Sequence, residues 1–249
     1  MKMIIRDVLG KALFSYEADG NTMRQTVEKA VASGVSLEKA DLAEASLIGA
    51  NLAGAMLAGA NLSHSHLLRA NLTGANLTGA HLVEAGLHGA NLTDANLNQA
   101  DLSLSRLDVA QLHGTQLVNA ALSGACFDKA DLTGANLTGA SLVNARLRHV
   151  IFVRANCSQV DLKGADVTDT DFSGTDFSGA SFIEAWFRGT CLSHANLANV
   201  NFSSAKFYGV NFSHADFKGA DFTGADFFRP DFTAANLEGI DLANVSLKM

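Results

Sequence analysis

The chain has 249 residues, of which 17% are charged and 48% hydrophobic, and its formal net charge is −7. The acidic balance disfavours general binding to nucleic acid or to an anionic membrane, and no apolar run approaches the ~18 residues that a membrane span needs. The three cysteines, Cys126, Cys157 and Cys191, are widely spaced, which indicates a reducing, cytoplasmic location and neither a disulfide framework nor a zinc site.

Residues 1–34 are predicted to form a separate N-terminal cap. A short hairpin is predicted for the segments IIRDV and KALFSYEA. Thr22 and Gln25 have the spacing of a capping box, and a glycine ends the apolar stretch that follows, so we expect a helix at about 22–33. This helix would cover the first turn of the domain formed by residues 35–249.

A repeat of five residues fills the rest of the chain. From Leu37 to Leu247 a large apolar residue recurs at every fifth position, which gives 43 pentads; it is Leu 28 times and Phe 13 times. A small residue, usually Ala, stands two positions before it. A period of five forms no apolar stripe on a helix and no single apolar face on a straight strand. Each pentad is therefore predicted to be a short extended side, with Ala and Leu pointing inward, followed by a corner.

Pentads such as ADLTG at Ala130, ANLTG at Ala135 and ADFTG at Ala220 resemble the pentapeptide-repeat family. The resemblance covers residues 35–249. It implies an all-β fold, a right-handed quadrilateral parallel β-helix with about four pentapeptides per coil, and hence a rod roughly 50 Å long. A filled rod offers no cleft, so we expect no enzyme, no cofactor and no metal site. The resemblance implies a rigid protein that binds other proteins.

Four pentads per coil divide the outward side chains among four walls. We name the Leu42 wall after its pentads centred on Leu42, Leu62 and every twentieth residue onward. It carries eight carboxylates against one cation, Lys163. This acidic face comprises Asp41, Glu44, Glu84, Asp101, Asp161, Glu184, Asp221 and Asp241.

The Leu47 wall, with pentads centred on Leu47, Leu67 and every twentieth residue onward, is basic overall and carries the only Trp of the chain. Arginine and aromatic side chains are enriched at the energetic centres of protein interfaces. We therefore predict a protein-binding patch here, with unconstrained surface variation as the alternative. The patch comprises Arg146, Arg148, Trp186, Arg188, Lys206, Tyr208 and Phe228.

The resemblance also suggests a second function. Some pentapeptide-repeat proteins mimic B-DNA, bind DNA gyrase or topoisomerase IV and protect it from quinolones, and the acidic face is compatible with this role. Members of that subgroup typically dimerise through a C-terminal helix, and many carry loops between coils. This sequence shows neither feature, so protein binding of another kind is the leading prediction.

Two further predictions concern the rod's end and one surface column. The repeats continue to Leu247 without a cap, which favours an end-to-end homodimer through the C-terminal coil; a bare, twisted or charged edge is the alternative. A column of Thr and Ser residues that includes Thr73, Thr93 and Thr133 could support binding to ice, but other residues interrupt it. This is the least favoured of the three functions.

Overall fold

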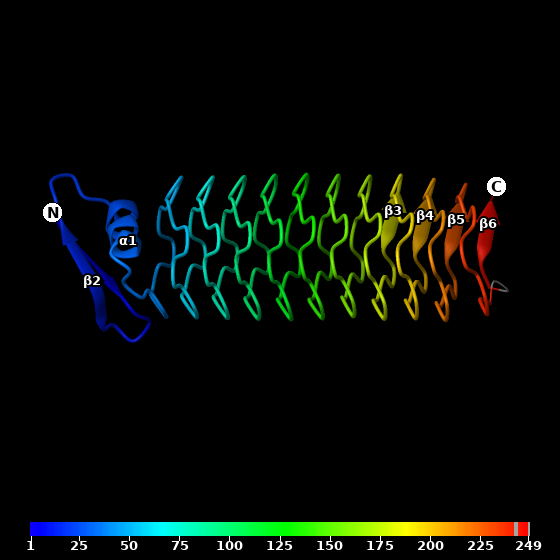
Figure 1. Ribbon diagram of the computed structural model, residues 1–249, viewed down its shortest axis with the longest axis horizontal. Helices are drawn as coiled ribbons and strands as arrows, with labels where there is room; N and C mark the ends of the chain where they lie inside the picture. Colours follow the sequence, from blue (N-terminus) through cyan, green and yellow to red (C-terminus); the bar gives the residue numbers. More distant parts are fainter. Residues whose placement is uncertain (242–243, 249) are drawn as a thin grey trace.

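The computed structural model describes residues 1–241 and 244–248 and shows a straight rod of stacked coils with a hairpin and a helix at one end (Figure 1). Parallel bridges join residues twenty positions apart, for example Asn51 to Asn71 and Asn71 to Asn91. Each coil therefore contains twenty residues, or four pentads, as the family resemblance implies. The pentad centre Leu242 lies outside the described residues.

Each pentad contributes an extended side and a corner. The amide of Leu52 donates to the carbonyl of Asn71 in the next coil at 2.7 Å, and the amide of Ala55 donates to the carbonyl of Leu52 at 3.0 Å to close the corner. The residue before this amide has a positive φ, which Gly54 adopts at +67° and Arg69, in an equivalent pentad, at +54°. This left-handed conformation explains why glycine is frequent at the end of a pentad.

The interior is packed with the central residues and the small residues that precede them. The Leu centres of the first coils are fully buried, and Phe takes over in the C-terminal half. There the rings form ladders: Phe207 has ring-centroid distances of 4.6 Å to Phe187 and 4.5 Å to Phe227. The rod is therefore a filled core without a channel.

The N-terminal segment contains an antiparallel hairpin of β1 (Lys2–Arg6) and β2 (Ala12–Glu17), followed by helix α1 (Met23–Ala32). Thr22 caps the helix: its hydroxyl oxygen accepts from the amide of Gln25, and the Gln25 side chain accepts from the amide of Thr22. The helix thus begins at the capping box found in the sequence.

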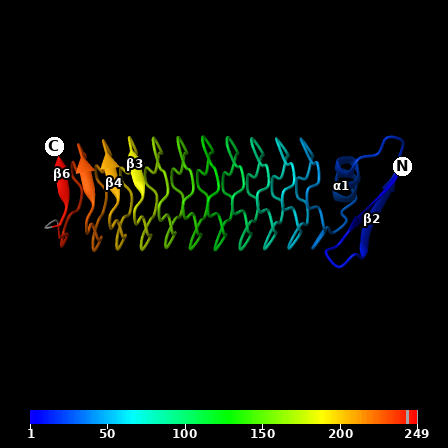
Figure 2. The ribbon, with the colours of Figure 1, turned by 180° about the vertical axis from the view of Figure 1, so that it is seen from behind.

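The hairpin and α1 lie against the first coil in both views of the ribbon (Figures 1 and 2). Val27 of α1 is fully buried in the cluster that forms the rod's core. The amide of Asp41 donates to the carbonyl of Arg6 at 2.7 Å, and the amide of Asn51 donates to the carboxylate of Glu28 at 2.9 Å. Backbone and side-chain hydrogen bonds thus join the N-terminal segment to the β-helix.

Four three-residue strands lie on the Leu47 wall near the C-terminal end. They form a parallel sheet in the order β3 (Trp186–Arg188), β4 (Lys206–Tyr208), β5 (Asp226–Phe228) and β6 (Ser246–Lys248). Within the described part of the chain, no helix has the length and apolar character required to cross a membrane.

Candidate functional site

The sheet β3–β6 turns part of the Leu47 wall into an extended platform. Most pentads have Asn or Asp before the centre, and its side chain accepts from the amide two residues later, as Asn71 does from Thr73 at 3.1 Å. Trp186 and Lys206 occupy this position in β3 and β4 and cannot close such a turn. Aromatic residues also favour extended backbone, and both features fit a strand here.

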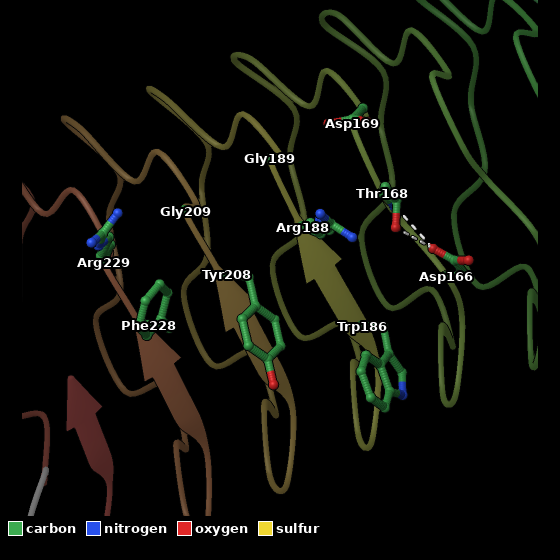
Figure 3. A pocket seen from close by; sticks show the side chains of 10 residues that line it. All are labelled: Asp166, Thr168, Asp169, Trp186, Arg188, Gly189, Tyr208, Gly209, Phe228 and Arg229. Carbon is green, nitrogen blue, oxygen red and sulfur yellow. Dashed lines mark hydrogen bonds between the residues drawn. The ribbon is translucent and has the colours of Figure 1, made fainter. Parts of the chain in front are cut away.

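Three aromatic side chains form a row along this platform (Figure 3). The ring centroids of Trp186 and Tyr208 are 6.5 Å apart with nearly parallel planes, and those of Tyr208 and Phe228 are 6.3 Å apart. The three residues are 49%, 38% and 39% exposed, respectively. Lys206 places its Nζ 4.4 Å from the centroid of the Trp186 ring, a cation–π contact. The row is an apolar surface open to solvent.

The row lines a groove of about 850 Å³, which we call the aromatic groove, although a filled rod was expected to offer no cleft. Arg188 and Arg229 also line it, and neither forms an ion pair with any other described residue. The guanidinium carbon of Arg229 lies 5.1 Å from the Phe228 ring centroid. Asp166 and Asp169 complete the charged part of the lining. The groove therefore combines apolar rings with two guanidinium groups that have no carboxylate partner of their own.

Asp166 is held ionised at the end of the groove. Both Nε and an Nη of Arg148 lie 2.6 Å from its Oδ2, and the Thr168 hydroxyl donates to its Oδ1 at 2.6 Å. Partial burial by itself would raise the pKa of Asp166, but the hydrogen bonds from Thr168 and Arg148 outweigh that effect and lower the pKa below its usual value. Arg148 therefore acts on the groove through Asp166.

A separate ionic cluster lies on the same wall, on the N-terminal side of the groove. Arg146 donates to the Sγ of Cys126 at 2.8 Å, and its Nε lies 2.9 Å from a carboxylate oxygen of Asp128. The thiol of Cys126 donates to Asp108 at 2.8 Å, and Arg106 lies 3.5 Å from the same carboxylate. Burial, with the Asp108 hydrogen bond, raises the pKa of Cys126, so this thiol is a weak nucleophile.

Asp108, Cys126 and Asp128 present possible ligand atoms within 4.8 Å of one another. The expectation of no metal site did not take this group into account, although the twenty-residue period places all three residues on one wall. Arg146 already contacts all three side chains. A cation would have to displace this guanidinium, so the arrangement fits an ion-pair network better than a metal site.

Further toward the N-terminal end, the Leu47 wall has a second hollow of about 370 Å³, which we call the aliphatic hollow. Ile48 and Leu68 line it and are 46% and 36% exposed. Gly86 forms part of the lining, together with His66, His88 and Arg106. This hollow was not part of the predicted binding patch, because the patch was chosen for Arg and aromatic residues and Ile48 and Leu68 are aliphatic.

The structure divides the predicted binding patch into two parts. Trp186, Arg188, Tyr208 and Phe228 line the groove and Lys206 contacts it, whereas Arg146 belongs to the ionic cluster. The groove adds residues that the patch lacked: Asp166, Thr168, Asp169, Gly189, Gly209 and Arg229. These residues recur at twenty-residue spacing on the same wall, and that spacing was the signal that could have revealed them.

The aspartates at the first position of the acidic face fall in one column. Bridges at twenty-residue steps connect Asp41 through to Asp101, Asp161 and Asp221. The three glutamates stand at corners, where Glu44, for example, has a positive φ of 57°. Hydrogen bonds donated by Thr223 lower the pKa of Asp221 most, and a hydrogen bond from Ser203 lowers it further. From Asp41 to Asp221, two residues without a carboxylate separate successive aspartates of this column.

The repeats match known family models over nearly the whole rod. The model described as "Pentapeptide repeats" matches in eight copies, and "Pentapeptide repeat region" matches residues 175–249. The former's matched segments are 33–68, 57–94, 70–108, 85–124, 115–153 and 155–193. No curated protein sequence matches the chain significantly.

HetL and QnrB1 are two of the solved structures that resemble the fold. HetL, a pentapeptide repeat protein involved in heterocyst differentiation regulation from the cyanobacterium Nostoc sp. strain PCC 7120, is 29% identical over 86% of this chain and 94% of HetL, with a TM-score of 0.56. A trypsin-treated variant of QnrB1, a plasmid-mediated fluoroquinolone resistance protein, is 22% identical over 75% of this chain and 89% of QnrB1, with a TM-score of 0.52. At that identity the likeness to QnrB1 concerns the fold alone.

Proposed function

Because the chain belongs to the pentapeptide-repeat family, we propose that it is a rigid, non-catalytic β-helical rod that binds another protein through the aromatic groove. The observation that carries the proposal is the solvent-exposed row of Trp186, Tyr208 and Phe228. Large apolar side chains gathered in one hollow gain most free energy when a partner covers them. Arg188 and Arg229, which form no ion pair with another described residue, line the same groove, and Arg is a second residue type that concentrates binding energy.

The chemistry of the groove indicates what a partner offers. Aliphatic or aromatic side chains would cover the row of rings, and hydrogen-bond acceptors would pair with Arg188 and Arg229. The backbone beneath the row is a hydrogen-bonded parallel sheet over a filled core, so little ordering of the groove is needed on binding. These features suit a protein surface that combines apolar side chains with hydrogen-bond acceptors.

The proposal is tested by affinity capture from the native host. A variant with Trp186→Ala and Tyr208→Ala is compared with the wild type, and a second variant with Met56→Ala and Ile151→Ala serves as the control. The control side chains are similarly exposed, at 39% and 41%, but lie on other walls. We expect quantitative mass spectrometry to show proteins that the first variant loses and the control retains. Equal recovery by all three proteins would refute the role of the groove.

DNA mimicry is less well supported by the acidic face. Aspartates in its first column recur at every third coil from Asp41 to Asp221, a separation of about 14 Å at a coil spacing of about 4.8 Å. B-DNA carries one negative charge per about 1.7 Å of its axis. A supercoiling assay with DNA gyrase, with and without a quinolone, tests this alternative, and no effect at micromolar protein would dispose of it.

Ice binding is weakened by the hydrogen bonds of the Thr column. The hydroxyl of Thr73 donates to Asn71 at 2.7 Å, and that of Thr133 donates to Asp131 at 2.6 Å. These hydroxyl protons are engaged within the chain and do not point to an external lattice. Absence of thermal hysteresis would exclude this function.

Two finer predictions about the assembly accompany the proposal. The coils are proposed to wind right-handedly, because crossovers between parallel strands have that hand almost without exception. The end-to-end homodimer also stays a prediction: Leu247 is 51% exposed, and Phe232, Leu237 and Val245 pack only partly against the core. Sedimentation of a Leu247→Asp variant tests that contact.

A further inference from the structure

Along the Leu47 wall, two hollows that contain exposed apolar side chains flank an ionic cluster. The aliphatic hollow with Ile48 and Leu68 lies toward one end, and the aromatic groove lies toward the other. The ionic cluster around Arg146 separates them. The order of the zones along the wall, from the hollow through the ionic cluster to the groove, is the same type of order from either end. A second copy of the wall that runs in the opposite direction therefore places a hollow opposite each groove and an ionic cluster opposite the other.

Gly86, at the floor of the aliphatic hollow, is unlike the other glycines of the chain. All 22 glycines lie in the described part of the chain, and Gly86 is the one whose φ is not positive. A Cβ built there would meet nothing closer than 3.8 Å, so neither the backbone nor crowding requires glycine. Because Gly86 has no side chain, the outer surface of the wall has free space at this position.

We propose that the protein bound in the aromatic groove is a second copy of this chain, packed antiparallel with the two Leu47 walls face to face. The inference rests on the proposed function and names the partner. The two-fold axis lies in the interface, perpendicular to the rods, midway between the bridged residues Cys126 and Arg146. Because every coil contains twenty residues, this one choice determines which residues oppose each other over the whole wall.

In this arrangement each ring of the groove opposes the aliphatic hollow of the other copy. The apolar pairs are Phe228 with Ile48, Tyr208 with Leu68, and Trp186 with Gly86 of the second copy. The largest exposed side chain thus faces the position without a side chain. The two-fold axis repeats all three contacts at the other end of the wall, so both apolar zones of both copies are covered.

The same axis brings opposite charges together in the middle of the wall. Asp128 opposes Arg148 of the second copy, and Arg106 opposes Asp166. Each of these side chains already has a partner in its own chain, so the second copy extends existing ion-pair networks at these positions. No pair of carboxylates and no pair of Arg or Lys residues is opposed in this register, in which Arg188 opposes His88 and Arg229 opposes Gly49.

Neighbouring registers are worse. Moving the axis by half a coil spacing toward one end places Arg146 opposite itself, and moving it equally toward the other end places Asp128 opposite itself. Like charges in direct opposition are unfavourable, and this selects one register over its neighbours.

The wall is large enough for a stable contact. Ten coils at about 4.8 Å give a length of about 48 Å, and four extended residues give a width of about 13 Å. The resulting contact of about 600 Å² per copy, measured as flat area, approaches the roughly 800 Å² of accessible surface that each partner buries in a standard interface.

Cysteine cross-linking tests the register directly. In a background with Cys126→Ser and Cys191→Ser, one chain carries Leu68→Cys and another carries Tyr208→Cys. We expect a short bis-maleimide to link the mixture into dimers and to leave each chain alone unlinked. In the antiparallel dimer, the two copies of position 208 lie about seven coils, or roughly 34 Å, apart. No link in the mixture, or equal linking of one variant alone, would overturn the proposal.

Sedimentation equilibrium supplies the second measurement. We expect the wild-type chain to dimerise and Arg148→Asp to raise the dimer Kd at least tenfold. Adding Asp128→Arg to that variant should restore dimerisation, because the exchanged charges again oppose each other. Lys163→Asp on the Leu42 wall is the control and should leave the Kd unchanged. A dimer lost only with Leu247→Asp would overturn the wall-to-wall arrangement.

The two proposals can fail separately. A monomeric wild-type chain whose Trp186→Ala and Tyr208→Ala variant still loses a captured protein would refute the self-association and leave the protein-binding groove intact. A monomer that captures nothing through the groove would refute both. A dimer that the same double substitution dissociates would support both, with the second copy as the protein that the groove binds.

Discussion

Replacing Phe207 with Ala should destabilise one half of the rod far more than the other. The Phe207 side chain is fully buried, with ring centroids of Phe187 and Phe227 at 4.6 and 4.5 Å. A buried Phe to Ala change costs roughly 3–5 kcal/mol through lost burial and the cavity that remains. Because this site lies between two stacked rings, we expect about 4 kcal/mol, near the middle of that range. In a solenoid the loss falls on the neighbouring coils first.

Urea denaturation followed by two probes measures this effect. Far-UV circular dichroism reports on the whole rod, whereas fluorescence reports on Trp186, the only Trp, one coil away from the substitution. We expect Phe207→Ala to lower the urea midpoint of Trp186 fluorescence more than Leu107→Ala does. Leu107 is equally buried on the same wall but lies four coils from Trp186. Equal shifts from the two variants, or a loss below about 1 kcal/mol for Phe207→Ala, would refute the reasoning.

Three smaller predictions address the cap, the corners and the charges. Thr22→Ala removes the capping box and should cost about 1 kcal/mol, seen as faster hydrogen exchange in α1; unchanged exchange would contradict the cap's role. Gly139→Ala should lower the stability more than Gly134→Ala. Both glycines have a positive φ, but the new Cβ at position 139 would lie 2.5 Å from the Asn119 side chain. Equal urea midpoints for the two variants would contradict this prediction. The pKa of Asp166 is lowered in the folded state, so the ionised carboxylate stabilises the fold above the unfolded pKa of about 3.9, and this contribution disappears as pH falls through the folded pKa. Asp166→Asn should therefore lose less stability than the wild type on acidification. Parallel plots of unfolding free energy against pH for the two proteins would contradict this prediction.

The interior of the rod could be predicted from the sequence because the period of five repeats it 43 times. The inward position of a centre such as Leu52 follows from its place in the pentad, and the capping box at Thr22 is a local signal read over four residues. Both depend on short-range patterns that the structure reproduces. The family resemblance supplied the one element that the period alone leaves open, the number of pentads in a coil.

The outer surface was predictable only in part. The period places Trp186 and Tyr208 on one wall, but it does not determine whether their rings approach each other or whether the backbone beneath them becomes a strand. Arg146 and Arg148 carry the same charge and lie two positions apart in the sequence. Arg146 nevertheless contacts Cys126 and Asp128, whereas Arg148 contacts Asp166. Such choices depend on side-chain conformation and on neighbours twenty residues away, which no short window of sequence contains.

The hydrogen bonding between coils also bears on how the chain is made. Each amide that pairs between coils finds its carbonyl about twenty positions away, and further backbone hydrogen bonds join the N-terminal segment to the first coil. During synthesis, a ribosome needs to release only about one further circuit before new backbone can pair with backbone already in place. The nascent protein can therefore wind progressively from the hairpin and helix, and it exposes only a short unpaired stretch at any moment.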